Sequence, residues 1–151
     1  MYSRKTWREK MDNPNLPKLV AVPPKMQKRL GRGIMLLPSP REVDAVIRSV
    51  GLGSVITVSQ IRQVLAQRYA ADVACPLVTG MFVRIAAEAA EEDAAAGKTE
   101  IAPYWRVVKD DGSLNPKFPG GVERQVERLR DEGRRIVRSG GKRPPRVVIA
   151  D

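Results

Sequence analysis

The sequence predicts a mainly α domain with short extended segments and basic flexible termini. Three observations support this: apolar residues recur at helical spacing in several central segments, glycine and proline mark where those segments begin and end, and the positive charge gathers at the two ends of the chain. A length of 151 residues suits one domain. We therefore divide the chain into a basic, proline-containing arm (1–33), a folded domain (34–138) and a basic tail (139–151).

The arm is expected to lack long helices, because prolines recur along it. Residues 25–30 are sufficient for a helical turn or two before Gly31. Trp7 is interpreted either as an exposed residue or as a ring that docks on the domain. We expect ordered structure to begin near Ile34.

Two helices are expected in the first half of the domain. Ser39 and Glu42 form a capping box around Pro40, and apolar residues recur at helical spacing over 43–50. After glycines 51 and 53, a short apolar stretch over 55–57 leads to a second helix. Either Thr57 or Ser59 can cap it.

A third, alanine-rich helix is predicted from Pro76 to Ala96, with Gly97 as its stop. Two consecutive helices with a short connection are typical of a helix-turn-helix, in which residues 76–90 would be the recognition helix. Its far end carries four carboxylates over 88–93, so we expect that end to point away from DNA.

Beyond Gly97 the chain alternates extended segments with turns. Residues 101–108 are predicted to be extended, and Asp110 and Asp111 are interpreted as turn formers rather than as a metal or acid–base pair. A loop over 117–121 leads to a helix that ends at Gly133. Residues 134–138 are expected to form a short strand, and 147–149 either a terminal strand or a disordered tail.

The charge favours a polyanionic partner. The net charge is +10; residues 1–41 contribute ten Lys and Arg against two Asp and Glu, residues 42–121 eight against ten, and residues 122–151 nine against five. Basic ends around a nearly neutral centre suit contacts to nucleic-acid phosphates that carry no sequence information.

Composition argues against several kinds of chemistry. The chain has no histidine, so it lacks the commonest metal ligand and general base, and its one cysteine, Cys75, permits no internal disulfide and no cysteine-based zinc site. Cys75 is interpreted as a small buried residue rather than a relocated nucleophile. We expect no cofactor, no membrane span or signal peptide, and a cytoplasmic location.

One constellation resembles a known family. The segment from Pro103 to Val108, followed by Asp111-Gly112, Gly120-Gly121 and Glu132-Gly133, resembles the active-site and downstream region of the O6-alkylguanine-DNA alkyltransferases. Upstream, residues 56–61 and 77–80 are similar to the family's helix-turn-helix. The resemblance spans roughly residues 35–137 and implies a winged helix-turn-helix-like domain that lays its recognition helix in the minor groove.

The departures from the family pattern concern its chemistry. Tyr104 stands in place of the family's nucleophilic cysteine, and Trp105 in place of its histidine. A phenol with a pKa near 10 and no histidine to activate it is a poor nucleophile. Pro76 stands at or near the arginine that the family inserts into the duplex, and Val58 matches its phosphate-facing tyrosine.

The resemblance therefore implies a non-enzymatic DNA-binding protein like the alkyltransferase-like branch, which flags alkylated guanine for nucleotide-excision repair. The implied partners are double-stranded DNA and a repair protein, and we expect a monomer. The alternative is a general DNA- or RNA-binding protein, nucleoid, regulatory or ribosome-associated, without lesion preference; an enzyme that uses Cys75 or Tyr104 is a third hypothesis.

The resemblance also implies two sets of site residues. Tyr104 and Trp105 either stack on a base or plug the former pocket, while Arg106 is first a structural residue. Gly120 and Gly121 are either pocket wall or an ordinary turn. The pocket set comprises Pro103, Tyr104, Trp105, Arg106, Gly120 and Gly121. The DNA-contact set comprises Ser59, Gln60, Gln63, Pro76, Thr79, Gly80 and Arg84, although Arg84 could equally pair with Glu88.

Overall fold

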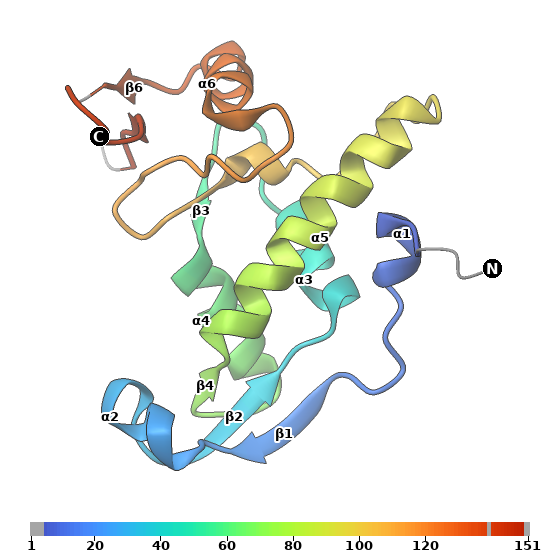
Figure 1. Cartoon of the computed structure of the whole chain (residues 1–151), viewed down its shortest axis with the longest axis vertical. Coiled ribbons are helices and arrows are strands. Elements are labelled where there is room, and N and C mark those ends of the chain that lie inside the picture. Colours follow the sequence, from blue (N-terminus) through green and yellow to red (C-terminus); the bar gives the residue numbers. More distant parts are fainter. Residues whose placement is uncertain (1–4, 139, 150–151) are drawn as a thin grey trace.

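The computed structural model describes residues 5–138 and 140–149 and confirms the mainly α prediction (Figure 1). The longest helix, α5, runs through the centre of the molecule, and the other elements are arranged around it. The helices are α1 (Trp7–Lys10), α2 (Gln27–Leu30), α3 (Pro40–Arg48), α4 (Val58–Arg68), α5 (Pro76–Ala95) and α6 (Gly121–Asp131), with 3-10 turns at Pro24–Met26 and Tyr104–Arg106.

The strands are short and form three small sheets. Strands β1 (Lys18–Ala21), β2 (Ile34–Leu37) and β4 (Val73–Ala74) form the first, in which β2 pairs antiparallel with β1 and parallel with β4. The second joins β3 (Ile56–Thr57) and β5 (Val107–Val108) in parallel. The third joins β6 (Ile136–Val137) and β7 (Arg146–Val147) antiparallel. These sheets tie distant chain segments to the helical centre.

The central helices begin where their sequence signals predict. Ser39 and Glu42 form the capping box of α3, and Thr57 and Gln60 form that of α4, so Thr57 rather than Ser59 is the cap. Pro76 is the first residue of α5. Each cap satisfies backbone N–H groups that a helix leaves without partners at its start.

Small side chains on α5 make the core possible. Alanines 86, 87, 89 and 90 are all buried, so α3 and α4 approach the α5 backbone closely. Larger apolar side chains fill the remaining space. They include Val43, Ile47, Ile61, Leu65, Phe82 and Val83.

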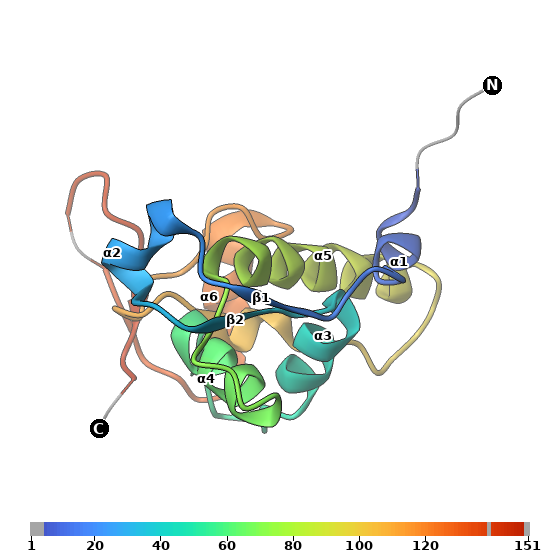
Figure 2. The ribbon, with the colours of Figure 1, turned by 90° about the horizontal axis from the view of Figure 1, so that it is seen from below.

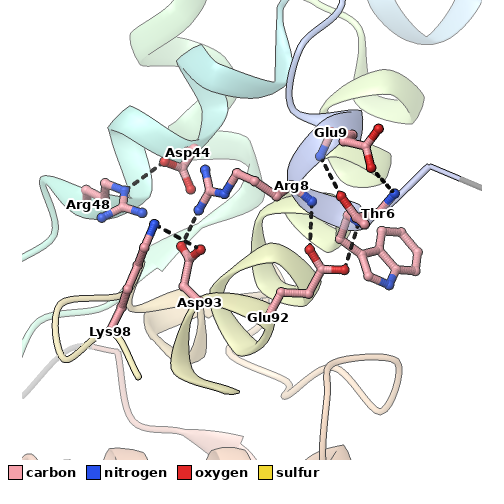
Figure 3. Close-up of polar contacts among 9 residues, drawn as sticks. Thr6, Arg8, Glu9, Asp44, Arg48, Glu92, Asp93 and Lys98 are labelled. Atoms are coloured by element: carbon pink, nitrogen blue, oxygen red, sulfur yellow. Dashed lines mark hydrogen bonds and ion pairs between the residues drawn. The ribbon is translucent and has the colours of Figure 1, made fainter. Parts of the chain in front are cut away.

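The N-terminal segment corrects our prediction of a flexible arm. Residues 5–33 belong to the fold: Met11 and Val22 are buried, and β1 pairs with β2 over four residues. The α1 helix lies against α5, where the Glu92 carboxylate accepts hydrogen bonds from the backbone N–H groups of Trp7 and Arg8 (Figure 3). The prolines exclude a long helix here, but they do not prevent strands and single turns.

A polar cluster fastens α1 to the C-terminal half of α5. Arg8 forms an ion pair with Asp93, whose other oxygen lies 3.5 Å from the Lys98 ammonium (Figure 3). Trp7 is half-buried, with the Lys10 ammonium 4.1 Å from its ring centroid. Trp7 therefore docks on the domain, which agrees with the second of our two interpretations and not with the first.

The C-terminal segment agrees with the strand alternative at Val147 and corrects our prediction of a flexible tail. Val147 is 4% exposed and packs with Leu114, and its backbone N–H donates to the Gly112 carbonyl. Of residues 147–149, only Val147 lies in a strand; residues 139, 150 and 151 lie outside the described residues. Strand β7 therefore closes the domain beside α6.

Candidate nucleic-acid interface

Helices α4 and α5, which the helix-turn-helix hypothesis concerns, follow each other in the chain. The connection is residues 69–75, and it contains β4. Arg62 of α4 holds it, since the Arg62 Nε donates to the Ala74 carbonyl at 2.9 Å. Ser59, Arg62 and Gln63 line a groove between α4 and β4. This contact joins α4 to the residue two positions before α5 begins.

The first two turns of α5 present an open face to solvent. Leu77 is 70% exposed and Met81 is 61% exposed, and their spacing of four residues places them side by side. Gly80 lies between them, and a Cβ added there would meet no atom within 4 Å beyond its own neighbours and the helix backbone. Arg84 is exposed one turn further along. This face is apolar and cationic, without carboxylates.

One of the predicted DNA contacts, Thr79, needs correction, whereas Ser59 is half-buried, Gln60 is exposed and both stay predictions. Thr79 is fully buried, and its hydroxyl donates to the Cys75 carbonyl, so it faces the core. The Ser59 hydroxyl donates to Asp110 at 2.6 Å, and the Gln60 side chain accepts from the Thr57 N–H. These three side chains already have partners within the protein.

The other predicted DNA contacts lie at the surface. Gln63, Gly80 and Arg84 are exposed, and Pro76 is half-buried at the start of α5. The Arg84 guanidinium lies 5.8 Å from the Trp7 ring centroid, and no ion pair joins it to Glu88 within the described part of the chain. Gly80 and Arg84 therefore share the open face of α5.

Tyr104, the first of the predicted pocket aromatics, is buried in the domain core. Its side chain is 2% exposed, and its ring meets those of Trp105 and Phe118 edge-on, with centroids 5.4 and 5.5 Å apart. Its hydroxyl donates to Glu91 at 2.5 Å. Burial and this carboxylate together raise the pKa of Tyr104 well above its ordinary value. Of our two interpretations of Tyr104, this arrangement favours the plug.

Arg106 joins three segments of the domain. Its guanidinium makes a two-pronged contact with Glu132, at 2.9 and 2.8 Å, and donates to the Val50 carbonyl at 2.6 Å. Trp105 donates its indole N–H to the same carboxylate at 3.0 Å. Burial opposes ionisation of Glu132, but these donors outweigh it and hold its pKa below the usual range. The structural interpretation of Arg106 therefore agrees with its contacts.

The remaining pocket residues form the frame around Tyr104. Pro103 is buried and immediately precedes the 3-10 turn. Gly120 and Gly121 have φ of 80° and 71°, in the left-handed region, and they begin α6. A side chain at Gly120 would collide with Arg124. Both glycines thus form the turn that our second interpretation described.

Three side chains outside these sets, those of Cys75, Asp110 and Asp111, make structural contacts. Cys75 is buried at the cap position of α5. Asp111 accepts from the Ser113 N–H in a turn, and Asp110 accepts from Ser59. Among the residues that the structure describes, no cluster of three or more His, Cys, Asp or Glu could hold a metal ion.

The acidic end of α5 serves internal contacts. Glu92 caps α1, Asp93 pairs with Arg8, and Glu91 accepts from Tyr104 while lying 3.1 Å from Arg128. The Arg128 guanidinium in turn covers the Trp105 ring at 4.3 Å. The carboxylates at this end therefore fasten neighbouring elements to the helix.

Sequence reasoning missed the placement of four cations near the start of α5. Lys25, Lys28, Arg29 and Arg32 belong to a segment that packs beside Cys75. The signal was available in Val22, Met26 and Leu30, which recur every four residues and form one apolar edge. We grouped these residues with the arm because of the neighbouring prolines.

Comparison with known proteins gives one structural similarity. No family model matches the chain, and no curated protein matches its sequence. The fold is similar to a chain in the crystal structure of S. pombe Atl1 in complex with damaged DNA containing O6-carboxymethylguanine, with 18% identity and a TM-score of 0.47, over 73% of this chain and 88% of that one. None of the described helices combines the length and apolar character that a bilayer crossing needs.

Proposed function

We propose that this protein is a non-enzymatic DNA-binding protein that places the open face of α5 in a groove of the duplex. The observation that carries the proposal is that face itself, formed by Leu77, Gly80, Met81 and Arg84. It belongs to the second helix of a helix–connection–helix unit, in a chain whose net charge is +10. Apolar side chains that gather at the surface mark an interaction site, and the arginine and the positive net charge favour a polyanionic partner.

The chemistry of this face indicates weak sequence discrimination. Base-specific contacts in the major groove need paired donors and acceptors, which Leu77, Gly80 and Met81 lack. Apolar side chains instead contact sugars and base faces in the minor groove, where readout is degenerate. Affinity would then come mainly from phosphate contacts and fall steeply with salt.

A non-enzymatic role is supported by the state of Tyr104. Alkyl transfer needs an accessible nucleophile, whereas this phenol is buried, its hydroxyl is held by Glu91, and its pKa is raised. The chain offers no histidine to activate it. Cys75 is buried as well.

A second candidate function is the sensing of alkylated guanine and the recruitment of a repair protein. It is supported by the similarity of residues 103–133 to the alkyltransferase pattern in sequence. The plugged position of Tyr104 argues instead for binding without lesion preference, because a flipped base would have to displace a ring packed on two others. We therefore place general duplex binding first.

Titration into two fluorescent duplexes that differ at a single O6-methylguanine, at two salt concentrations, separates these functions. We expect equal, salt-sensitive binding to both and no change in the protein's intact mass. Tighter binding to the damaged duplex would favour lesion sensing, and a gain of one methyl group would refute the non-enzymatic proposal. Tighter binding to an RNA duplex would show an RNA-binding protein.

A further inference from the structure

Four cations crowd one short segment next to the proposed DNA-binding helix. The 3-10 turn at Pro24–Met26 continues directly into α2, and the eight residues 25–32 carry two lysines and two arginines. We call this segment the basic turn. All four side chains are exposed, and within the described residues none forms an ion pair or a side-chain hydrogen bond. They are Lys25, Lys28, Arg29 and Arg32.

Apolar contacts place the basic turn at the N-terminal end of α5. Met26 and Leu30, one helical turn apart, pack on the buried cluster that contains Cys75, together with Val78. Cys75 lies at the N-cap position of α5, and Val78 lies in its first turn. Figures 1 and 2 both show α2 at the end of the molecule opposite to α1. The four charges therefore lie beside the turns that present Leu77 and Met81.

Backbone contacts fix the basic turn to the connection between α4 and α5. The Val22 N–H donates to the Gly33 carbonyl at 2.9 Å, which closes the base of the loop. The Ile34 N–H donates to the Asp72 carboxylate at 2.8 Å, and the Asp72 N–H donates back to Ile34. Gly33, with φ of +129°, permits this approach because a side chain there would overlap the Asp72 carboxylate. These bonds thus hold the basic turn against the connection between the two helices.

We propose that the basic turn is a phosphate-binding element that contacts the DNA backbone next to the groove occupied by α5. This inference rests on the proposed DNA-binding function. Four like charges within eight residues repel each other, and the nearby carboxylate of Asp72 is already occupied by a backbone N–H. A run of backbone phosphates supplies the missing counter-charge, and such contacts fix the position of a protein on the duplex without reading its sequence.

The basic turn can be tested by removing its charge without touching its apolar contacts. One variant replaces Lys25, Lys28, Arg29 and Arg32 with glutamine. The matched control makes the same change in net charge at four other exposed cations, also without ion pairs in the described chain. These are Arg130, Arg135, Lys142 and Arg143. Circular dichroism and thermal unfolding establish that both variants fold like the wild type.

The readout is the dependence of duplex affinity on salt. Each lost phosphate contact reduces the magnitude of the slope of log K against log salt by about 0.9. We therefore expect this magnitude to fall by about 2 to 3.5 in the basic-turn variant and by less than about 1 in the control. Hydroxyl-radical footprinting should show one patch of backbone protection missing in the basic-turn variant alone.

Three outcomes would overturn the inference, and each has a different meaning. If both variants bind DNA with the same slope and the wild-type footprint, the basic turn makes no phosphate contacts, although the proposed function stands. If the wild type binds no duplex even at low salt, both proposals fail. A basic-turn variant that loses binding to anionic lipid vesicles or to RNA, but retains the wild-type slope on duplex DNA, would assign the segment to another polyanion.

Discussion

Replacing Tyr104 with alanine would separate a ring that plugs the domain from one that binds a base. The ring is almost fully buried, and its removal should destabilise the protein by about 3–5 kcal/mol, the range for a large aromatic side chain cut to alanine. Within that total, the edge-on contacts with Trp105 and Phe118 account for about 0.5–1.5 kcal/mol each beyond burial. Tyr104→Phe keeps the ring and should cost about 1 kcal/mol, because Glu91 retains Arg128 as a partner.

Urea denaturation followed by circular dichroism gives the change in unfolding free energy, and duplex titration gives the affinity of the folded variant. We expect Tyr104→Ala to bind undamaged and O6-methylguanine duplexes within about twofold of wild type wherever it is folded. A base that stacks on the ring would contribute about 1–3 kcal/mol, so its loss would weaken binding by about five- to 150-fold. A loss of that size with little change in stability would refute the plug.

Three further predictions follow from the contacts of single side chains. Glu132→Gln breaks the buried ion pair with Arg106. It should lower the free energy of unfolding, measured by urea denaturation at pH 7, by about 3 kcal/mol. Because the pKa of Glu132 in the folded protein lies below its ordinary value, the difference between wild type and this variant should shrink as the pH falls through the range in which free carboxylates take up protons. A constant difference would contradict the pKa argument. Thr57→Ala removes the helix cap and should lower the free energy of unfolding by about 1 kcal/mol. Ser59→Ala removes no cap, so it should lose only the hydrogen bond to Asp110. Leu77→Gln with Met81→Gln should leave the melting temperature unchanged and weaken duplex binding; unchanged affinity would exclude the open face from the interface.

The helices of the domain could be predicted from the sequence because their signals are local. Capping boxes, a proline at the first helical position and a glycine stop each act within one turn of helix, so Ser39 and Thr57 marked two starts correctly. The same holds for the turn at Asp111, which bonds two residues along the chain. Such contacts need no knowledge of the rest of the fold.

The termini could not be placed because their stability comes from partners far away in the sequence. Strand β1 pairs with β2 across a connection of twelve residues, and α1 is capped by Glu92, about 85 residues away. Proline indicates correctly that no long helix forms here, but it does not distinguish a flexible arm from a docked hairpin. Only the helical spacing of the apolar residues Met26 and Leu30 indicates, from local sequence, that this segment packs on the domain.

The candidate site was predicted in part, since helical position alone does not fix which side chains face solvent. Gly80 and Arg84 lie on the open face as expected, whereas Thr79 faces the core because α3 and α4 cover that side of α5. The partners of Ser59 and Gln60 come from a distant turn and from a helix cap. Leu77 and Met81 were assigned to the helix but not to the site, because exposed apolar residues have no sequence signal of their own.

The most direct test of the central claim is to place a carboxylate on the open face of α5. Gly80 has open space around it, so Gly80→Glu and the control Gly80→Ala should both fold, with stability raised by up to about 1 kcal/mol through better helix propensity. Fluorescence anisotropy with a labelled duplex at low salt then compares the two variants. We predict that Gly80→Ala binds within a few-fold of wild type and that Gly80→Glu loses binding at least tenfold. Equal binding by both variants would contradict the claim that this face meets DNA.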